Sequence, residues 1–244
     1  KRFRIDPSWI EKRSPRFDEL ANVIEKDTAT FREIFELYGS LIWADYVCEQ
    51  PLWMRAECLA ALRQLARNIE GDYDRACPFP EYALDNLRAW IVDVRENPWR
   101  VPVPDRQPSE ADTLLFSDAL SSAGAWIRIF KNQITAGDQW IHSEDLHIYL
   151  HELDAMCAAA LSGPRSDKTL HLVDNTAVVG TACRGHSSSY PANVKMRATF
   201  GRNKPWTKWV STHDQLADPF TRGEKLPTLP STISAQQCKV IASL

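Results

Sequence analysis

The sequence contains no run of apolar residues approaching the about eighteen that a membrane-spanning helix requires. Its first residues, Lys1 to Arg4 followed by Asp6-Pro7, lack the apolar stretch of a secretory signal. Its six cysteines are scattered without a C-x-x-C pair, which argues against a zinc module and against a disulfide framework. We therefore expect a protein with no membrane association in a reducing, intracellular compartment, the nucleus or the cytoplasm.

The chain also has little net charge and no internal repeats. A net charge of −3 does not by itself suggest a nucleic-acid-binding protein. What is present is an ordinary globular composition, with 44% hydrophobic residues in 244. That length allows a sizeable core in one large domain or two smaller ones.

The N-terminal part has the apolar spacing of helices. Residues 1–15 are basic and polar and are predicted to form an extended arm. From Phe17 to about Trp99, apolar residues recur three and four positions apart, which predicts a small helical domain. A bundle without chemistry of its own is the simplest interpretation of this region.

A proline-rich segment, residues 97–112, separates this region from a different pattern. It contains four prolines and is predicted to be a linker, with the domain boundary near residue 108. Beyond it, alternating strand and helix patterns predict an α/β domain over 109–223, followed by a loose C-terminal tail over 224–244. Five strands are expected, at 113–118, 125–131, 138–143, 169–174 and 206–211. Helices are expected at about 149–161, 176–183 and 191–200.

The first expected strand ends on an acid. Leu114 to Phe116 are apolar, Asp118 follows, and small residues lead through Gly124 into a second strand. A carboxylate at the edge of a buried sheet is costly to desolvate unless a cation accompanies it.

Three further acids stand at the ends of predicted elements. Glu152 lies in the first turn of a helix, Asp174 ends the fourth strand, and Asp218 opens the last short helix. Taken singly, such acids are more often turn or cap residues. Together they supply hard oxygen ligands that suit Mg²⁺ or Mn²⁺. Two such ions, roughly 3.5–4 Å apart, can catalyse phosphodiester cleavage.

On these residues the sequence resembles a family. Residues 113–223 resemble the ribonuclease H domain of reverse transcriptases, particularly those of tyrosine-recombinase retrotransposons of the DIRS/Ngaro/VIPER group. The four acids stand 34, 22 and 44 residues apart, which is similar to the spacing in these domains. The motifs that carry the resemblance are Ser117-Asp-Ala with Gly124-Ala, His151-Glu-Leu, Val173-Asp-Asn-Thr-Ala-Val, Arg184-Gly-His-Ser-Ser-Ser189 and Asp214-Gln-Leu-Ala-Asp-Pro-Phe-Thr-Arg-Gly223.

The resemblance extends upstream but is incomplete. Leu37-Tyr-Gly-Ser-Leu-Ile-Trp-Ala44 resembles a helix of the reverse-transcriptase thumb, so the helical domain would be the thumb or connection. Leu120 and Asp214 stand where the family more often has Ser and Asn. No Tyr-Asp-Asp polymerase motif is present, and fingers and palm are missing. An upstream polymerase portion or a partner protein would have to supply them, unless the chain is a domesticated remnant.

The resemblance implies a ribonuclease H-like α/β domain with a mixed five-stranded sheet, preceded by a small all-α domain. It implies that Asp118, Glu152, Asp174 and Asp218 bind two Mg²⁺ ions. His213, just before the motif that contains the fourth acid, would assist product release or proton transfer. His147 and His151, four residues apart without a third ligand, are interpreted as structural.

The charge between Lys168 and Trp209 supports a nucleic-acid substrate. Seven basic residues stand against one acid, Asp174, with aromatic residues between them. A solvated basic face is the alternative interpretation. The candidate contacts to nucleic acid are Asn175, Arg184, His186, Lys195, Arg197 and Arg202.

Two functional hypotheses follow. The first is a metal-dependent endonuclease that cleaves the RNA strand of RNA–DNA hybrids, as part of a reverse transcriptase or derived from one. The second is a catalytically retired fold that serves as a scaffold or RNA-binding subunit of a larger ribonucleoprotein assembly. An integrase or resolvase fits poorly, because those sites use a different order of acids.

Overall fold

The structure is a computed structural model that describes residues 4–99, 107–143, 145–163 and 168–243. The described chain divides into two compact units, one of residues 4–99 with 188–194 and the other of residues 107–187 with 195–243. Residues 100–106 of the predicted linker lie outside the described residues, as does Pro164, where a helix was expected to end. Among the described helices, none combines the length and apolar character needed to cross a membrane.

The first unit is helical, as its apolar spacing predicts. Its long helices are α1 (Pro7–Glu25), α2 (Phe31–Val47), α3 (Ala56–Asn68) and α4 (Leu84–Glu96). Short 3₁₀ turns, η1 (Leu52–Arg55) and η2 (Glu81–Ala83), precede α3 and α4. The interpretation of residues 1–15 as an arm is wrong for the described part, because α1 begins at Pro7. Asp6 caps that helix by accepting a hydrogen bond from the Ser8 amide, and proline is favourable at the first helical position.

The first unit buries a charged cluster at the junction of its helices. The Arg55 guanidinium donates to Asp45 of α2 at 3.0 Å and to Asp93 of α4 at 2.8 Å. Its side chain is only 3% exposed and lies over the Trp90 ring, 5.4 Å from the ring centroid. One cation therefore links η1 to two helices and compensates two carboxylates inside the core.

The second unit is built on one mixed sheet. Its strands are β1 (Thr113–Ala119), β2 (Ala123–Phe130), β3 (Gln133–Ile141), β4 (Thr169–Val173), β5 (Trp206–Trp209) and β6 (Ser231–Thr232). Their order is β5-β4-β1-β2-β3-β6, with β1 parallel to β4 and antiparallel to β2. The described sheet thus has six strands where five were expected. The additional strand is a two-residue pairing of β6 with the start of β3.

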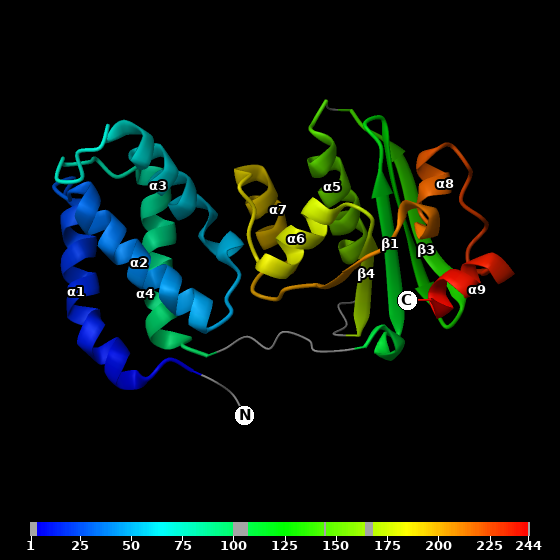
Figure 1. The fold of residues 1–244 in the computed structure, drawn as a ribbon, viewed down its shortest axis with the longest axis horizontal. Helices are drawn as coiled ribbons and strands as arrows, with labels where there is room; N and C mark the ends of the chain where they lie inside the picture. The colour runs from blue at the N-terminus through cyan, green and yellow to red at the C-terminus, as the bar shows by residue number, and fades with distance from the viewer. Residues whose placement is uncertain (1–3, 100–106, 144, 164–167, 244) are drawn as a thin grey trace. The chain divides into compact units, whose positions relative to one another are not determined.

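Helices cover both faces of this sheet (Figure 1). On one side lie α5 (Ile148–Leu161) and α6 (Thr176–Arg184), and on the other lie α8 (Asp218–Thr221) and α9 (Ala235–Ala242). The helix α7 (Tyr190–Phe200) and two 3₁₀ turns, η3 (Pro108–Glu110) and η4 (Thr212–Asp214), complete the described elements. This mixed sheet with flanking helices is consistent with a ribonuclease H-like fold.

The segment after residue 223 is ordered into elements, contrary to the expectation of a loose tail. Ser234 and Gln237 form a capping box that starts α9. Ile233 is buried in the sheet core, and Ile241 packs against the same cluster. The polar composition of the tail concealed these two anchoring residues.

Candidate metal centre

Asp118 is held at the C-terminal end of the central strand β1. Opposite it on β2 is Ala125, a small, fully buried residue. The Asp118 side chain is buried, and its Oδ2 accepts a hydrogen bond from Thr221 Oγ1 at 2.8 Å. The same hydroxyl lies 2.8 Å from the Asp218 carbonyl oxygen, so one threonine links β1 to α8.

Glu152 comes from the second turn of α5, at the helix end near the β1 terminus. His147 caps this helix, with Nδ1 accepting from the Tyr149 amide, which agrees with its interpretation as structural. The next residues along the helix, including Leu153 and Met156, are buried in the core. The packed helix therefore presents Glu152 toward the sheet end, although the Glu152 side chain is itself buried.

Asp174 follows β4 directly. The parallel pairing of β1 with β4 brings the ends of these strands side by side. The next residue, Asn175, caps α6 by accepting from the amides of Ala177 and Val178. A strand end and a helix start therefore fix the Asp174 backbone on both sides.

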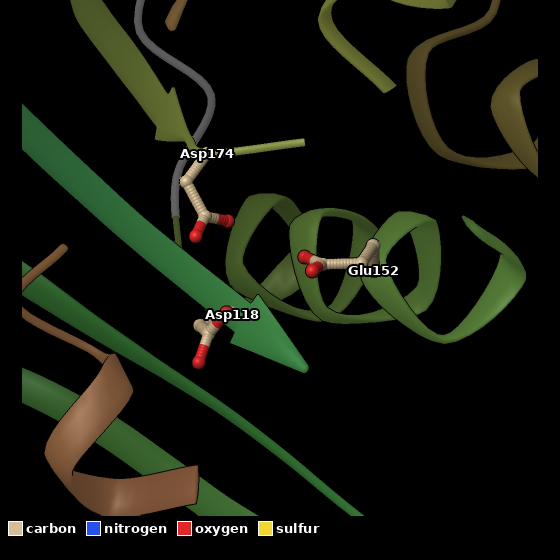
Figure 2. Close-up of side chains that lie close together, drawn as sticks. All are labelled: Asp118, Glu152 and Asp174. Atoms are coloured by element: carbon tan, nitrogen blue, oxygen red, sulfur yellow. The ribbon is translucent and has the colours of Figure 1, made fainter. Parts of the chain in front are cut away.

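These three carboxylates converge. Figure 2 shows Asp118, Glu152 and Asp174 around the end of β1. Each offers one oxygen atom such that all three atoms lie within 4.8 Å of one another. Burial raises the pKa of Glu152 to about 9, with smaller contributions from the charges of Asp118 and Asp174. Burial likewise raises the pKa of Asp118 to about 6, against the lowering effect of the Thr221 hydrogen bond.

Oxygen atoms of this cluster lack hydrogen-bond partners within the described structure. Glu152 Oε2 and Asp174 Oδ1 are both buried and unpartnered. Buried acceptors without partners are rare and costly. Converged carboxylate oxygens are hard ligands of the kind that Mg²⁺ prefers, so the cluster could hold a divalent cation. The residues present therefore fit the metal expected from the sequence.

Asp218 is not part of this three-residue cluster. Both of its carboxylate oxygens accept from Arg222 Nε, at 2.9 and 2.8 Å, across one helical turn. The pKa of Arg222 is raised, first by this hydrogen bond and then by the charge of Asp218, with a weaker effect from Asp118. The expected four-acid site is thus present as three converged acids, with the fourth paired to an arginine.

Residues that the sequence interpretation missed hold this centre in place. Gln215 Nε2 donates to the carbonyl oxygens of Ser117 at 2.9 Å and Leu172 at 3.4 Å. These are the backbones of β1 and β4, just where their pairing ends. Thr212 Oγ1 donates to Asp174 Oδ2 at 3.0 Å. Gln215 lies inside the Asp214–Gly223 motif, yet only the fold shows that its side chain reaches the strands.

The histidine and basic candidates differ in their exposure and in their partners. His213 is exposed in η4, directly after Thr212. Lys195 of α7 pairs with Asp154 of α5. Arg184 is exposed at the end of α6, whereas His186, Arg197 and Arg202 are partly buried. Asn175 is engaged in capping, so its amide oxygen already has partners. A role for these six side chains in binding nucleic acid stays a prediction.

His151, the residue before Glu152 on α5, is buried. Its ring lies 3.7 Å from that of His142, centroid to centroid, at an interplanar angle of 32°. Neither of its nitrogens has a hydrogen-bond partner among the described residues. Its position on the α5 packing face accords with its interpretation as structural.

Comparison with known proteins gives matches to solved structures. No family model and no curated protein matches the chain. Among solved structures, it is 12% identical to a foamy viral protease-reverse transcriptase in complex with double-stranded DNA, with a TM-score of 0.31, covering 86% of this chain and 35% of that one. It is also 12% identical to the foamy viral enzyme in complex with an RNA/DNA hybrid, with a TM-score of 0.32, covering 89% of this chain and 28% of that one. The chain therefore spans about a third of the length of these viral proteins, and the likeness is weak.

Proposed function

We propose that this chain is a metal-dependent endonuclease that cleaves the RNA strand of RNA–DNA hybrids. The observation that carries the proposal is the convergence of Asp118, Glu152 and Asp174, in which two buried oxygens have no hydrogen-bond partner among the described residues. The ribonuclease H-like order of the sheet and the sequence motifs around these acids support the same activity. We propose that the chain is part of a reverse transcriptase of the DIRS/Ngaro/VIPER type or a remnant of one.

The three acids and Asp218 are the proposed ligands of two Mg²⁺ ions, with Mn²⁺ as an alternative. When bound, such ions polarise the phosphodiester, lower the pKa of the attacking water and neutralise the charge that develops on the leaving oxygen. Binding would also replace the protons that the raised pKa values of Asp118 and Glu152 retain in the metal-free protein. Asp218 would join the other acids by exchanging its pairing with Arg222 for the metal.

The remaining residues of the site have supporting roles in this proposal. Thr212 and Thr221 hold the carboxylates of Asp174 and Asp118 by hydrogen bonds. His213, exposed beside Thr212, would give a proton to the leaving oxygen or assist product release. Contacts from the basic residues of α6, α7 and the following turn would follow the phosphate backbone, and 2′-hydroxyl contacts would distinguish RNA from DNA.

The proposal is tested by incubating the purified chain with Mg²⁺ and a hybrid labelled on its RNA strand. Wild type should cut the RNA strand, and Asp174→Asn should reduce the rate by at least about 100-fold, because it removes a metal ligand. Asp138→Asn is the matched control, since Asp138 is exposed on β3, two strands from β1, and is not one of the converged acids. If wild type does not cut, or if Asp174→Asn cuts as fast, the proposal fails.

The pairing of Asp218 with Arg222 specifically favours the second candidate, a catalytically retired scaffold or RNA-binding subunit. A retired centre would bind no ion. Adding Mg²⁺ or Mn²⁺ at 100 times the dissociation constant should stabilise a nuclease site by about 2.7 kcal/mol. A chain whose thermal unfolding is unchanged by either metal, and which still binds RNA, would support the scaffold.

A further inference from the structure

The proposed fourth ligand, Asp218, is paired with an arginine one helical turn later. Arg222 follows α8 directly, and its Nε donates to both carboxylate oxygens of Asp218, at 2.9 and 2.8 Å. No hydrogen bond within the described chain uses the two terminal nitrogens of this guanidinium. Arg222 is therefore anchored by one carboxylate and keeps four N–H donors for a second anion.

The preceding residue ties Arg222 to the acid cluster. Thr221 Oγ1 donates to Asp118 Oδ2 at 2.8 Å, so the end of α8 is linked to the acid on the central strand. The charge of Asp118 also contributes to the raised pKa of Arg222, after the stronger effects of Asp218. The guanidinium thus lies within electrostatic reach of the cluster. Its side chain is nevertheless 59% exposed, so a ligand can approach its free donors.

The pairing of Arg222 with Asp218 can be broken at little cost. Ion pairs at the surface contribute little to stability, because water solvates both charges when they separate. A divalent cation bound by Asp218 would neutralise the carboxylate that Arg222 now holds and would repel the guanidinium. Asp218 is the ion-pair partner of Arg222 within the described chain, so the released guanidinium would need an anion from outside it.

We propose that Arg222 binds a backbone phosphate of the strand that is cut, next to the scissile bond, when Asp218 binds an ion. A planar guanidinium can donate to two phosphate oxygens at once, which an ammonium group cannot match. Phosphates stay accessible on the outside of a base-paired hybrid, so this contact requires no unpaired or unstacked base. The inference rests on the proposed function, because it assigns a contact to the substrate of that site.

The test measures hybrid binding by Arg222→Gln and Arg222→Lys in Ca²⁺, which occupies oxygen sites. Arg222→Gln should weaken binding roughly 10-fold, because it removes hydrogen bonds between charged groups. It should also reduce the slope of log affinity against log salt concentration by about one, since one phosphate contact is lost. Arg222→Lys keeps the charge without the planar fork, so it should restore the salt slope and only part of the affinity.

Lys131→Gln is the matched control. Lys131 is an exposed cation of the same unit, directly after β2. The neighbouring Phe130 pairs with Thr113 at the start of β1, at the opposite end of that strand from Asp118. Salt screens exposed charges that are far apart, so this variant should leave both the affinity and the salt slope unchanged.

Hybrids that each carry one uncharged methylphosphonate, on a 2′-deoxy nucleotide of the RNA strand, locate the contact. The reference for each is the same hybrid with an ordinary phosphate on that 2′-deoxy nucleotide. Wild type should lose affinity at a linkage beside the cut. Arg222→Gln should be insensitive at that linkage, since the two changes remove the same contact. A misfolded variant would instead lose affinity without this dependence on position.

The outcomes separate this inference from the proposed nuclease. If wild type cuts and binds the hybrid while Arg222→Gln binds it equally well, the inference is wrong and the nuclease stands. Tighter Mg²⁺ binding by Arg222→Gln without weaker hybrid binding would also overturn it, because Arg222 would then only cover Asp218. An Arg222→Gln variant that stays as sensitive as wild type at every methylphosphonate contradicts it as well. If wild type neither cuts nor binds, both proposals fail.

Discussion

Both units of this protein bury carboxylates at the junction of several elements, but they balance the charge differently. In the helical unit, Asp45 and Asp93 share the buried guanidinium of Arg55. In the α/β unit, Asp118, Glu152 and Asp174 converge without an ion pair to any basic residue of the described chain. The first arrangement has a protein cation in contact with both acids, although burial raises the pKa of Asp45, whereas the second needs protons or a cation from solution.

The difference teaches how a structural charge cluster can be told from a binding site. A buried acid that has a protein cation is accounted for by folding alone. Burial raises the pKa of Glu152 to about 9. An acid of this kind weakens the fold unless a cation binds beside it. Each of the following changes should affect the two clusters in opposite or unequal ways.

The largest effect is expected from removing the internal cation. Arg55→Met leaves Asp45 and Asp93 buried without a partner and should destabilise the helical unit by about 3–5 kcal/mol. Hydrogen exchange, which resolves the two units, should show faster exchange in α2 and α4. Arg88→Met is the control, because Arg88 pairs with Glu25 and Asp85 at the surface and should cost less than about 1 kcal/mol. Similar losses in both variants would remove the contrast.

Neutralising an acid of the α/β cluster should have the opposite sign. In metal-free protein at pH 8, Glu152→Gln should stabilise the unit by roughly 1–3 kcal/mol, since it removes a group whose ionisation burial opposes. Urea denaturation measures this change. Glu224→Gln, at an exposed position in the same unit, should have no effect. A destabilised Glu152→Gln variant would show that the carboxylate has a structural role.

The same comparison should depend on pH. Asp118 and Glu152 have folded pKa values of about 6 and about 9, above their ordinary values of 3.8 and 4.5. The folded protein therefore binds more protons than the unfolded chain in this range. Their contribution to metal-free stability is fully present below about pH 4 and is lost as pH rises, to about pH 6 for Asp118 and to about pH 9 for Glu152, by up to about 1.4 kcal/mol per pH unit for each group.

Denaturation of wild type and Glu152→Gln from pH 5 to 9 isolates the glutamate's share. The stability difference between them should be small at pH 5 and grow with pH. A saturating concentration of Mg²⁺ should abolish that growth, because the ion stabilises the ionised form. A difference independent of pH would contradict the raised pKa.

The smallest effect is expected at Thr221. Thr221→Val removes the hydroxyl that donates to Asp118 and should cost about 1 kcal/mol of stability. It should also raise the pKa of Asp118 further, since this hydrogen bond lowers it. Thr232→Val, at an exposed position of β6, provides the reference, and equal stabilities of the two variants would argue against the bond.

Much of the architecture follows from local patterns. Apolar runs predicted strands at the places of β1 to β5, although β3 begins at Gln133, five residues before its expected start. Gly185, with a φ of 81°, ends α6 where a helix end was expected. The extra strand β6 was missed because a two-residue pairing has no periodicity. The start of α1 was missed because basic residues concealed the Asp6-Pro7 start signal.

The sequence predicted the three acids that converge, but it did not predict the residues that hold them in place. Asp118, Glu152 and Asp174 stand at element ends, which a sequence shows and a sheet then brings together. The pairing of Asp218 with Arg222 has the i,i+4 spacing of helical ion pairs, which could have been noticed in the sequence. The hydrogen bond from the Trp209 indole to the Asp174 carbonyl oxygen depends on strand register, which no local pattern specifies.

The Gln215 amide has a consequence for how the centre is encoded. All three converged acids lie between residues 118 and 174, yet the gap between the two strands that hold Asp118 and Asp174 is bridged by a side chain some forty residues later. The Gln215 side chain links β1 and β4 where their pairing ends, and so helps to fix the distance between the strand ends that carry Asp118 and Asp174. A fragment ending before this residue would retain each of the three acids and lose the spacing that makes them a centre.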